Sequence, residues 1–160
     1  MLHPQPPQPP SHCRPATRCP LTDYLLFLDT ETTGLPQHWG LPYAQGRWPY
    51  VAQLAWQVYR ADGSFVKEEN HYLQVPEGTM PASAVAVHGI TPEFLAAHGQ
   101  PPAPVLQRLL ADLARYQPRV IGYFLQLDFH VIGAALHRAG LPNPLPALPQ
   151  FCVMRVSGRP

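Results

Sequence analysis

The sequence predicts an α/β fold in which a mixed β-sheet is flanked by helices. An apolar run at 24–28 is typical of a buried strand, and the alternating apolar residues of 51–60 are typical of a half-buried one. Between Val105 and Leu113, apolar side chains recur at helical spacing. The order of these patterns is a strand, a hairpin, helices, a strand and a helix, which indicates βα units added to a hairpin.

The first three strands have clear local signals. The strand at 24–28 runs straight into the polar segment Asp29-Thr30-Glu31-Thr32-Thr33-Gly34. The strand at 51–60 reaches the tight-turn pair Asp62-Gly63, and the chain returns as a partner strand at 65–75. These residues therefore predict one strand followed by a hairpin.

The helices that follow are marked by capping residues. A short helix is expected at 81–87. Thr91 as N-cap and Pro92 at the first helical position begin a second helix, which Gly99 ends. A third, amphipathic helix is expected to continue to about Tyr116.

The last third of the chain predicts one more βα unit. Residues 119–124 form a short apolar run that is typical of a strand. A helix is expected at 127–139, because Gly140 follows as a stop. The proline-rich remainder predicts only one further strand-like piece, at 150–156.

Size and composition indicate one folded domain with a tail. Of the 160 residues, 22 are proline, and seven of these prolines fall within residues 1–20. We expect 1–20 to be a disordered tail and 21–160 to be the domain. Neither a signal peptide nor a membrane-spanning stretch is recognisable, so a cytoplasmic protein without a membrane partner is expected.

Net charge and cysteine content exclude few classes of function. The net charge is +1, so any nucleic-acid binding must come from a local site. Three cysteines, at 13, 19 and 152, are too few for a disulfide framework. A zinc site formed by His12, Cys13 and Cys19 is not favoured, because their spacing fits no common zinc pattern.

Three carboxylates are candidates for metal-dependent chemistry. Asp29 and Glu31 lie at i and i+2 of an extended segment, so they project to the same side. Two acids so close repel each other unless a cation lies between them, and hard divalent cations prefer oxygen ligands. Asp128, in the first turn of the last long helix, can face the same crevice. The alternatives are a strand that ends in a polar turn, and an acid that only stabilises a helix N-terminus.

Three segments resemble one family. Residues 27–35 (FLDTETTGL) resemble the first motif of the DEDD superfamily of 3′–5′ exonucleases. Residues 87–91 (VHGIT) resemble a segment of its DEDDh-type branch, the proofreading subunits and ribonuclease T. Residues 120–128 resemble the second motif, usually VGHN followed by a phenylalanine and an aspartate. The resemblance spans about 24–140 and implies a ribonuclease H-like fold that is C-terminally incomplete, because the family's last helix has no counterpart.

The resemblance also implies an activity, namely hydrolysis of terminal phosphodiesters at single-stranded 3′ ends of DNA or RNA. Two Mg²⁺ or Mn²⁺ ions, roughly 3.5–4 Å apart, activate water and neutralise charge in such sites. Asp29 would bridge both ions, Glu31 would serve the nucleophile side and Asp128 the leaving-group side. Substrate-binding residues would be Thr32, Thr33, Gly34, Leu35 and His88. A DNA polymerase is an implied candidate partner.

The chain departs from the family at two points. The fourth aspartate and its histidine base have no counterpart, since no acid follows Asp128. Tyr123 and Phe124 also stand where histidine and asparagine are usual. Three carboxylates without a base predict an incomplete two-metal site that activates water poorly. His137 as a replacement base would point away from Asp128.

The departures leave several interpretations open. One is a truncated exonuclease with impaired activity, and another is a catalytically inactive nucleic-acid-binding or interaction module of the same fold. A third is a chain that does not fold stably, because loss of a covering helix exposes apolar sheet. The aromatic residues of loop 36–49 fit either base stacking or an exposed hydrophobic loop.

Overall fold

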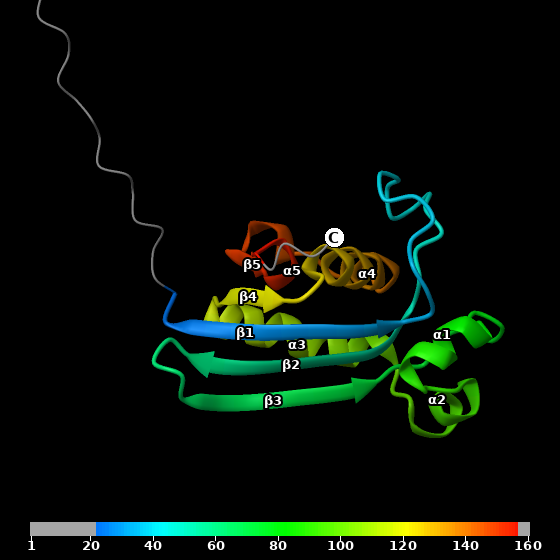
Figure 1. The fold of residues 1–160 in the computed structure, drawn as a ribbon, viewed down its shortest axis with the longest axis horizontal. Coiled ribbons are helices and arrows are strands. Elements are labelled where there is room, and N and C mark those ends of the chain that lie inside the picture. Colours follow the sequence, from blue (N-terminus) through cyan, green and yellow to red (C-terminus); the bar gives the residue numbers. More distant parts are fainter. Residues whose placement is uncertain (1–21, 157–160) are drawn as a thin grey trace, which may run out of the picture.

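The structure, a computed structural model, describes residues 22–156, so the tail expected at 1–20 lies outside the described residues. Five strands form one mixed sheet in the order β3-β2-β1-β4-β5 (Figure 1). Neighbours β1, β2 and β3 pair antiparallel, whereas β4 and β5 add in parallel. The strands are β1 (Tyr24–Thr32), β2 (Val51–Arg60), β3 (Phe65–Tyr72), β4 (Arg119–Gly122) and β5 (Gln150–Cys152). The predicted mixed sheet with flanking helices is confirmed.

The helices begin and end close to the predicted positions. Thr91 caps the second helix, where its Oγ1 accepts a hydrogen bond from Phe94 N at 3.1 Å. The third helix ends at Tyr116, as predicted. The helices are α1 (Ala82–His88), α2 (Pro92–His98), α3 (Pro102–Tyr116), α4 (Leu125–Arg138) and α5 (Val153–Val156), with a short 3₁₀ turn η1 (Leu145–Ala147) before β5.

Three strand predictions were too long. The strand predicted at 119–124 ends at Gly122, because α4 begins at Leu125 and the chain turns before it. Residues 153–156 form α5 instead of extending β5, because Cys152 pairs with Gly122, the last residue of β4, and no partner strand lies beyond it in the described chain. The chain after Tyr72 leaves the main sheet as well. Leu73 makes an isolated bridge to Gln100 instead of continuing β3.

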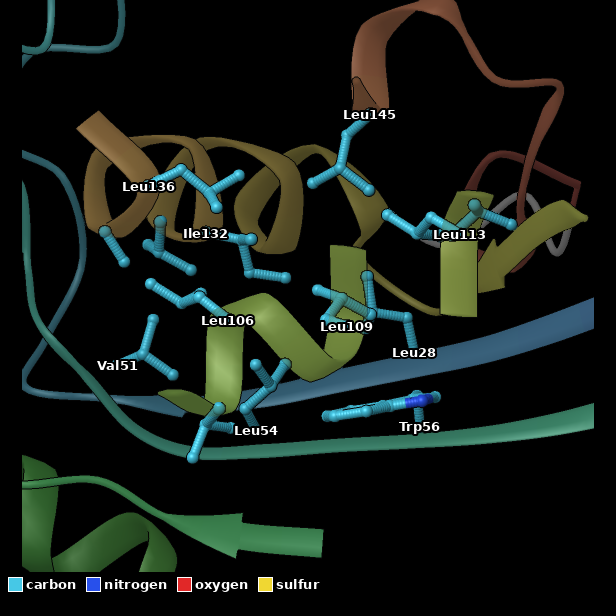
Figure 2. Packing of buried hydrophobic residues seen from close by; sticks show 14 of the residues in the cluster. Leu28, Val51, Leu54, Trp56, Leu106, Leu109, Leu113, Ile132, Leu136 and Leu145 are labelled. Atoms are coloured by element: carbon cyan, nitrogen blue, oxygen red, sulfur yellow. The ribbon is translucent and has the colours of Figure 1, made fainter. Parts of the chain in front are cut away.

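The hydrophobic core lies between one face of the sheet and the helices α3 and α4 (Figure 2). Alternate side chains of β1 and β2 point into it, as strand geometry requires. Fully or almost fully buried members include Leu26, Leu28, Leu54 and Trp56 from the sheet, and Leu106, Leu109, Ile132 and Leu136 from the helices. This packing fixes α4, and therefore its first turn, against β1.

A buried polar contact fixes α3 against the sheet at its β3 edge. Trp56 Nε1 donates to Asp112 Oδ2 at 2.8 Å, and Lys67 Nζ lies 2.9 Å from the same oxygen. Asp112 on α3 is buried, so these partners compensate a charge that would otherwise be costly to bury. The contact is structural and lies on the helix-covered face of the sheet, opposite to the face from which Asp29 and Glu31 project.

The opposite face of the sheet carries exposed aromatic side chains. Phe27 and Phe65 are 41% and 56% exposed, and the Tyr59 ring lies 5.6 Å from each, centroid to centroid. In Figure 1, α3 passes behind the strands when this face is towards the viewer. Because side chains alternate along β1, Asp29 and Glu31 project from the same face as Phe27.

Candidate active site at the carboxyl end of β1

Asp128 is directed from α4 to β1. Thr30 Oγ1 donates to Asp128 Oδ1 at 2.7 Å, across 98 positions of sequence, and the Asp128 residue is only 4% exposed. The structure therefore brings the first and second predicted motifs together. The carboxylate bonds to a neighbouring strand, which a residue serving only as a helix cap would not require.

Gly122 permits this close approach. A Cβ at Gly122 would lie 2.8 Å from Leu125 Cδ1 and 3.0 Å from the Leu28 carbonyl oxygen, both tighter than normal contacts. It would also lie 3.5 Å from Asp128 Oδ2. The missing side chain at the end of β4 thus lets the first turn of α4 reach the backbone of β1.

Burial and a neighbouring charge perturb the carboxylates. Burial raises the pKa of Asp128 to about 7, the Thr30 hydroxyl opposes that rise, and the negative charge of Asp29 adds to it. Burial also raises the pKa of Asp29. The backbone N–H of Thr30 lowers the pKa of both groups, so both carboxylates lie beside the same amide. An acid whose pKa is raised by burial and by the charge of a second acid is a common feature of functional sites.

The side chains at this site are of the type that binds a hard divalent cation, but they do not form a complete ligand set. Carboxylate oxygens are the ligands that Mg²⁺ and Mn²⁺ prefer. Glu31 lies on the same face of β1 as Asp29, just before the register of β1 against β2 shifts. Within residues 22–156, however, no three side chains of the types Asp, Glu, His and Cys are grouped so as to hold one ion. Asp29 and Asp128 are the pair that the structure brings together.

Four of the predicted substrate-binding residues, Thr32 to Leu35, form a turn at the end of β1. Thr32 Oγ1 donates to the Gly34 carbonyl oxygen at 2.7 Å. Thr33 is joined to Tyr50 by two hydrogen bonds, from Thr33 N to Tyr50 O at 2.9 Å and from Tyr50 N to Thr33 Oγ1 at 3.0 Å. Leu35, the last residue of the turn, is 68% exposed, so its side chain is free to meet a ligand.

His88 supports this turn from α1. Its Nδ1 accepts a hydrogen bond from Ile90 N at 3.0 Å, which places the ring proton on Nε2. Nε2 then donates to the carbonyl oxygen of Thr32 at 3.2 Å. Both ring nitrogens are therefore engaged with backbone, and the role that the contacts support is positioning of the turn.

The aromatic loop packs on α4. The rings of Trp48 and His130 stack at a centroid distance of 5.0 Å and an interplanar angle of 11°, and Trp48 is 3% exposed. Trp39 and Tyr43 lie at 5.7 and 6.3 Å from the same imidazole. Both alternatives, base stacking and an exposed hydrophobic loop, were therefore wrong for Trp48, because its ring is buried and stacks on His130 of α4.

His137 and Arg138, at the end of α4, make different contacts. His137 lies beside Tyr43, at 6.3 Å between ring centroids, so the packing gives no support to a role as base beside Asp128. Arg138, interpreted from sequence only as a complement to the helix dipole, donates to the carbonyl oxygens of Trp48 and Pro49. Its guanidinium also lies 4.1 Å from the centroid of the Tyr50 ring. No local sequence signal reveals such contacts, since they join residues about 90 positions apart.

The fold defines a class, an α/β protein with a sheet and helices arranged as in ribonuclease H-like exonucleases. Solved structures that it resembles include those of exonuclease I. A product-bound exonuclease I matches with a TM-score of 0.70 and 20% sequence identity, over 85% of this chain and 31% of that one. E. coli exonuclease I bound to a dT13 oligonucleotide matches with the same TM-score and identity, over 84% of this chain and 29% of that one.

This likeness establishes the fold. The chain spans only about 31% of the length of the exonuclease I structure that it matches. No protein-family model matches the sequence, and no curated protein does. Within the described part of the chain, helices are too short or too polar to cross a bilayer. The DEDDh-type branch and its catalytic residues therefore stay predictions.

Proposed function

We propose that this chain is a metal-dependent 3′–5′ exonuclease domain that removes nucleotides from single-stranded ends of DNA or RNA. One observation carries the proposal, the convergence of Asp29 and Asp128 on Thr30 at the end of β1 within an exonuclease fold. We assign the domain to residues 21–160 and a tail to 1–20. A cytoplasmic location and a polymerase partner are part of the same hypothesis.

The roles follow from the positions of the residues. Asp29, Glu31 and Asp128 would hold Mg²⁺ or Mn²⁺, which in such sites activates water and neutralises phosphate charge. Thr30 orients the Asp128 carboxylate through its hydroxyl. The turn at 32–35 would receive the terminal nucleotide, with the exposed Leu35 side chain against its base.

The test is nucleotide release by the full-length chain. A 5′-labelled single-stranded oligonucleotide, as DNA and as RNA, is incubated with Mg²⁺ or Mn²⁺ and resolved by length. We expect stepwise shortening from the 3′ end, its abolition by Asp29→Asn or Asp128→Asn, and no effect of Asp23→Asn, an exposed acid just before β1. Absence of shortening by the wild-type chain, or an Asp128→Asn variant as active as wild type, would refute the proposal.

A second candidate is a binding module of the same fold without catalysis. It is favoured by one observation, that no third metal-ligating side chain joins Asp29 and Asp128 in residues 22–156. Binding of single-stranded ends that is unaffected by chelator and by Asp29→Ala, in a chain that releases no nucleotide, would support it. Absence of any binding would exclude it.

A further inference from the structure

A polar pocket of about 470 Å³ lies beside the turn that follows β1. One wall is the turn itself, Thr33 to Leu35, and the other is the end of the β1–β2 loop with Arg138 of α4. Arg47 from the same loop also lines it. We call it the Arg138 pocket. It is separate from Asp29 and Asp128, which do not line it.

The Arg138 guanidinium is held in place with donors to spare. A guanidinium has five N–H donors, and the contacts to Trp48 and Pro49 occupy two of them. The ring of Tyr50 supports one face of the group at 4.1 Å. The remaining donors are available to a ligand, in an orientation that the two carbonyls and the ring have already fixed.

The positive charge of the pocket is not neutralised within the described chain. The ion pairs found in residues 22–156 all involve Lys67 or His71, so neither Arg47 nor Arg138 is paired with a carboxylate there. Removal from water lowers the pKa of Arg138, as expected for a cation packed against protein without a counter-ion. Two unpaired guanidinium groups in one polar pocket favour an anionic ligand.

The pocket has a fixed position relative to the turn. The reciprocal hydrogen bonds between Thr33 and Tyr50 join the turn to the residue on which Arg138 lies. A ligand that meets the turn with one part can therefore reach the two arginines with its next part. A strand of nucleic acid carries a phosphate at each such step.

We propose that the Arg138 pocket binds a backbone phosphodiester of the single strand, close to the terminal nucleotide that the turn receives. This inference rests on the proposed function and adds a phosphate subsite to it. A guanidinium contact to phosphate carries no base information, so the subsite is independent of sequence and serves DNA and RNA alike. Its role is to position the strand, since neither Asp29 nor Asp128 lines it.

Arg47→Gln is the sharpest test, because Arg47 is exposed and no contact that holds the fold is described for it. Binding of fluorescein-labelled oligothymidylate and oligouridylate is measured in EDTA over a range of salt. Loss of one phosphate contact to a single strand reduces the salt slope by about 0.7. The expected weakening is therefore about eightfold at 50 mM salt and only about threefold at 200 mM. Arg60→Gln, at the far end of β2, is the matched control and leaves the slope unchanged.

The role of Arg138 is tested with two variants, because its side chain also binds the backbone of the β1–β2 loop. Arg138→Lys and Arg138→Gln both lose the fork that binds two carbonyls, but only the lysine keeps the charge. We expect the glutamine variant to lose about 0.7 of the salt slope and the lysine variant to retain it. A purely structural role for Arg138 would make the two variants equal.

An oligonucleotide with one uncharged linkage tests whether a backbone phosphate is the group that the pocket binds. In wild type, one methylphosphonate among the linkages nearest the 3′ end should weaken binding about eightfold at 50 mM salt. In Arg47→Gln the same linkage should have little further effect. Three outcomes would overturn the subsite and leave the proposed function intact. They are an unchanged salt slope in Arg47→Gln, losses of affinity from Arg47→Gln and from the methylphosphonate that add together, and an effect seen with RNA alone. No binding of either probe by wild type, together with no nucleotide release in Mg²⁺ or Mn²⁺, overturns both.

Discussion

Replacement of Asp128 by asparagine should stabilise the fold, and increasingly so as the pH rises. The asparagine side chain would keep an amide oxygen to accept the Thr30 hydroxyl, so the hydrogen bond across to β1 survives. The substitution removes the ionisable carboxylate of a residue that is only 4% exposed and lies near a second acid, Asp29. The variant therefore isolates the electrostatic cost of ionising this position.

The magnitude follows from the pKa. The pKa of Asp128 is raised from 3.8 to about 7 in the folded state, so the folded chain binds the proton more tightly than the unfolded chain. Stability from this group is fully present below about pH 4 and is lost as the pH rises through about 7. At about 1.4 kcal/mol per pH unit, the loss by about pH 8 is roughly 4 kcal/mol.

Urea unfolding followed by circular dichroism, in EDTA at several values between about pH 4 and about pH 8, measures this difference. The advantage of Asp128→Asn over wild type should grow by roughly 4 kcal/mol across the range. The exposed Asp23→Asn is the control and should track wild type. Parallel curves for Asp128→Asn and wild type would refute the assignment of a buried, proton-binding Asp128.

Three more variants test neighbouring features. Gly122→Ala places a Cβ 3.0 Å from the Leu28 carbonyl, so we expect a loss of about 1–3 kcal/mol in urea unfolding, together with impaired nucleotide release; wild-type behaviour would contradict the close approach. Thr30→Val removes the hydroxyl that lowers the pKa of Asp128, so that pKa should rise further and Mg²⁺, measured by calorimetry, should bind more weakly; unchanged binding would exclude Asp128 as a ligand. His88→Phe removes two hydrogen bonds, so unfolding free energy should fall by about 1–3 kcal/mol and KM for single strands should rise more than kcat falls; an unchanged KM would argue against a positioned turn.

Local patterns were sufficient for most of the fold. The alternation in 51–60 and the cap at Thr91 are properties of short segments, and both elements lie where they were predicted. The error at 153–156 arose because a strand needs a partner, and β4 ends at Gly122. Whether a partner continues is decided elsewhere in the chain, so no pattern within 150–156 could reveal it.

Only some residues of the candidate site could be predicted from the sequence. The acids Asp29 and Asp128 were found because each follows a strand, and strands of one sheet end at a shared edge. Thr30, which joins them, gave no signal, since its role depends on the direction of its hydroxyl towards α4. The stacking of Trp48 on His130 was likewise invisible, because residues 82 positions apart meet only after α4 has packed.

The hydrogen bonds between Thr33 and Tyr50 have a consequence for how this architecture can change. Together with Arg138 they close the base of the loop that begins after the turn, so residues 36–47 leave and re-enter the fold at nearly one place. Lengthening a loop whose ends are already fixed adds only a small closure entropy, about 0.6 kcal/mol for each doubling of length. Insertions at the exposed tip, near Leu41 and Ala44, are thus a route by which such a chain gains new surface beside the strand-end acids while their geometry is conserved.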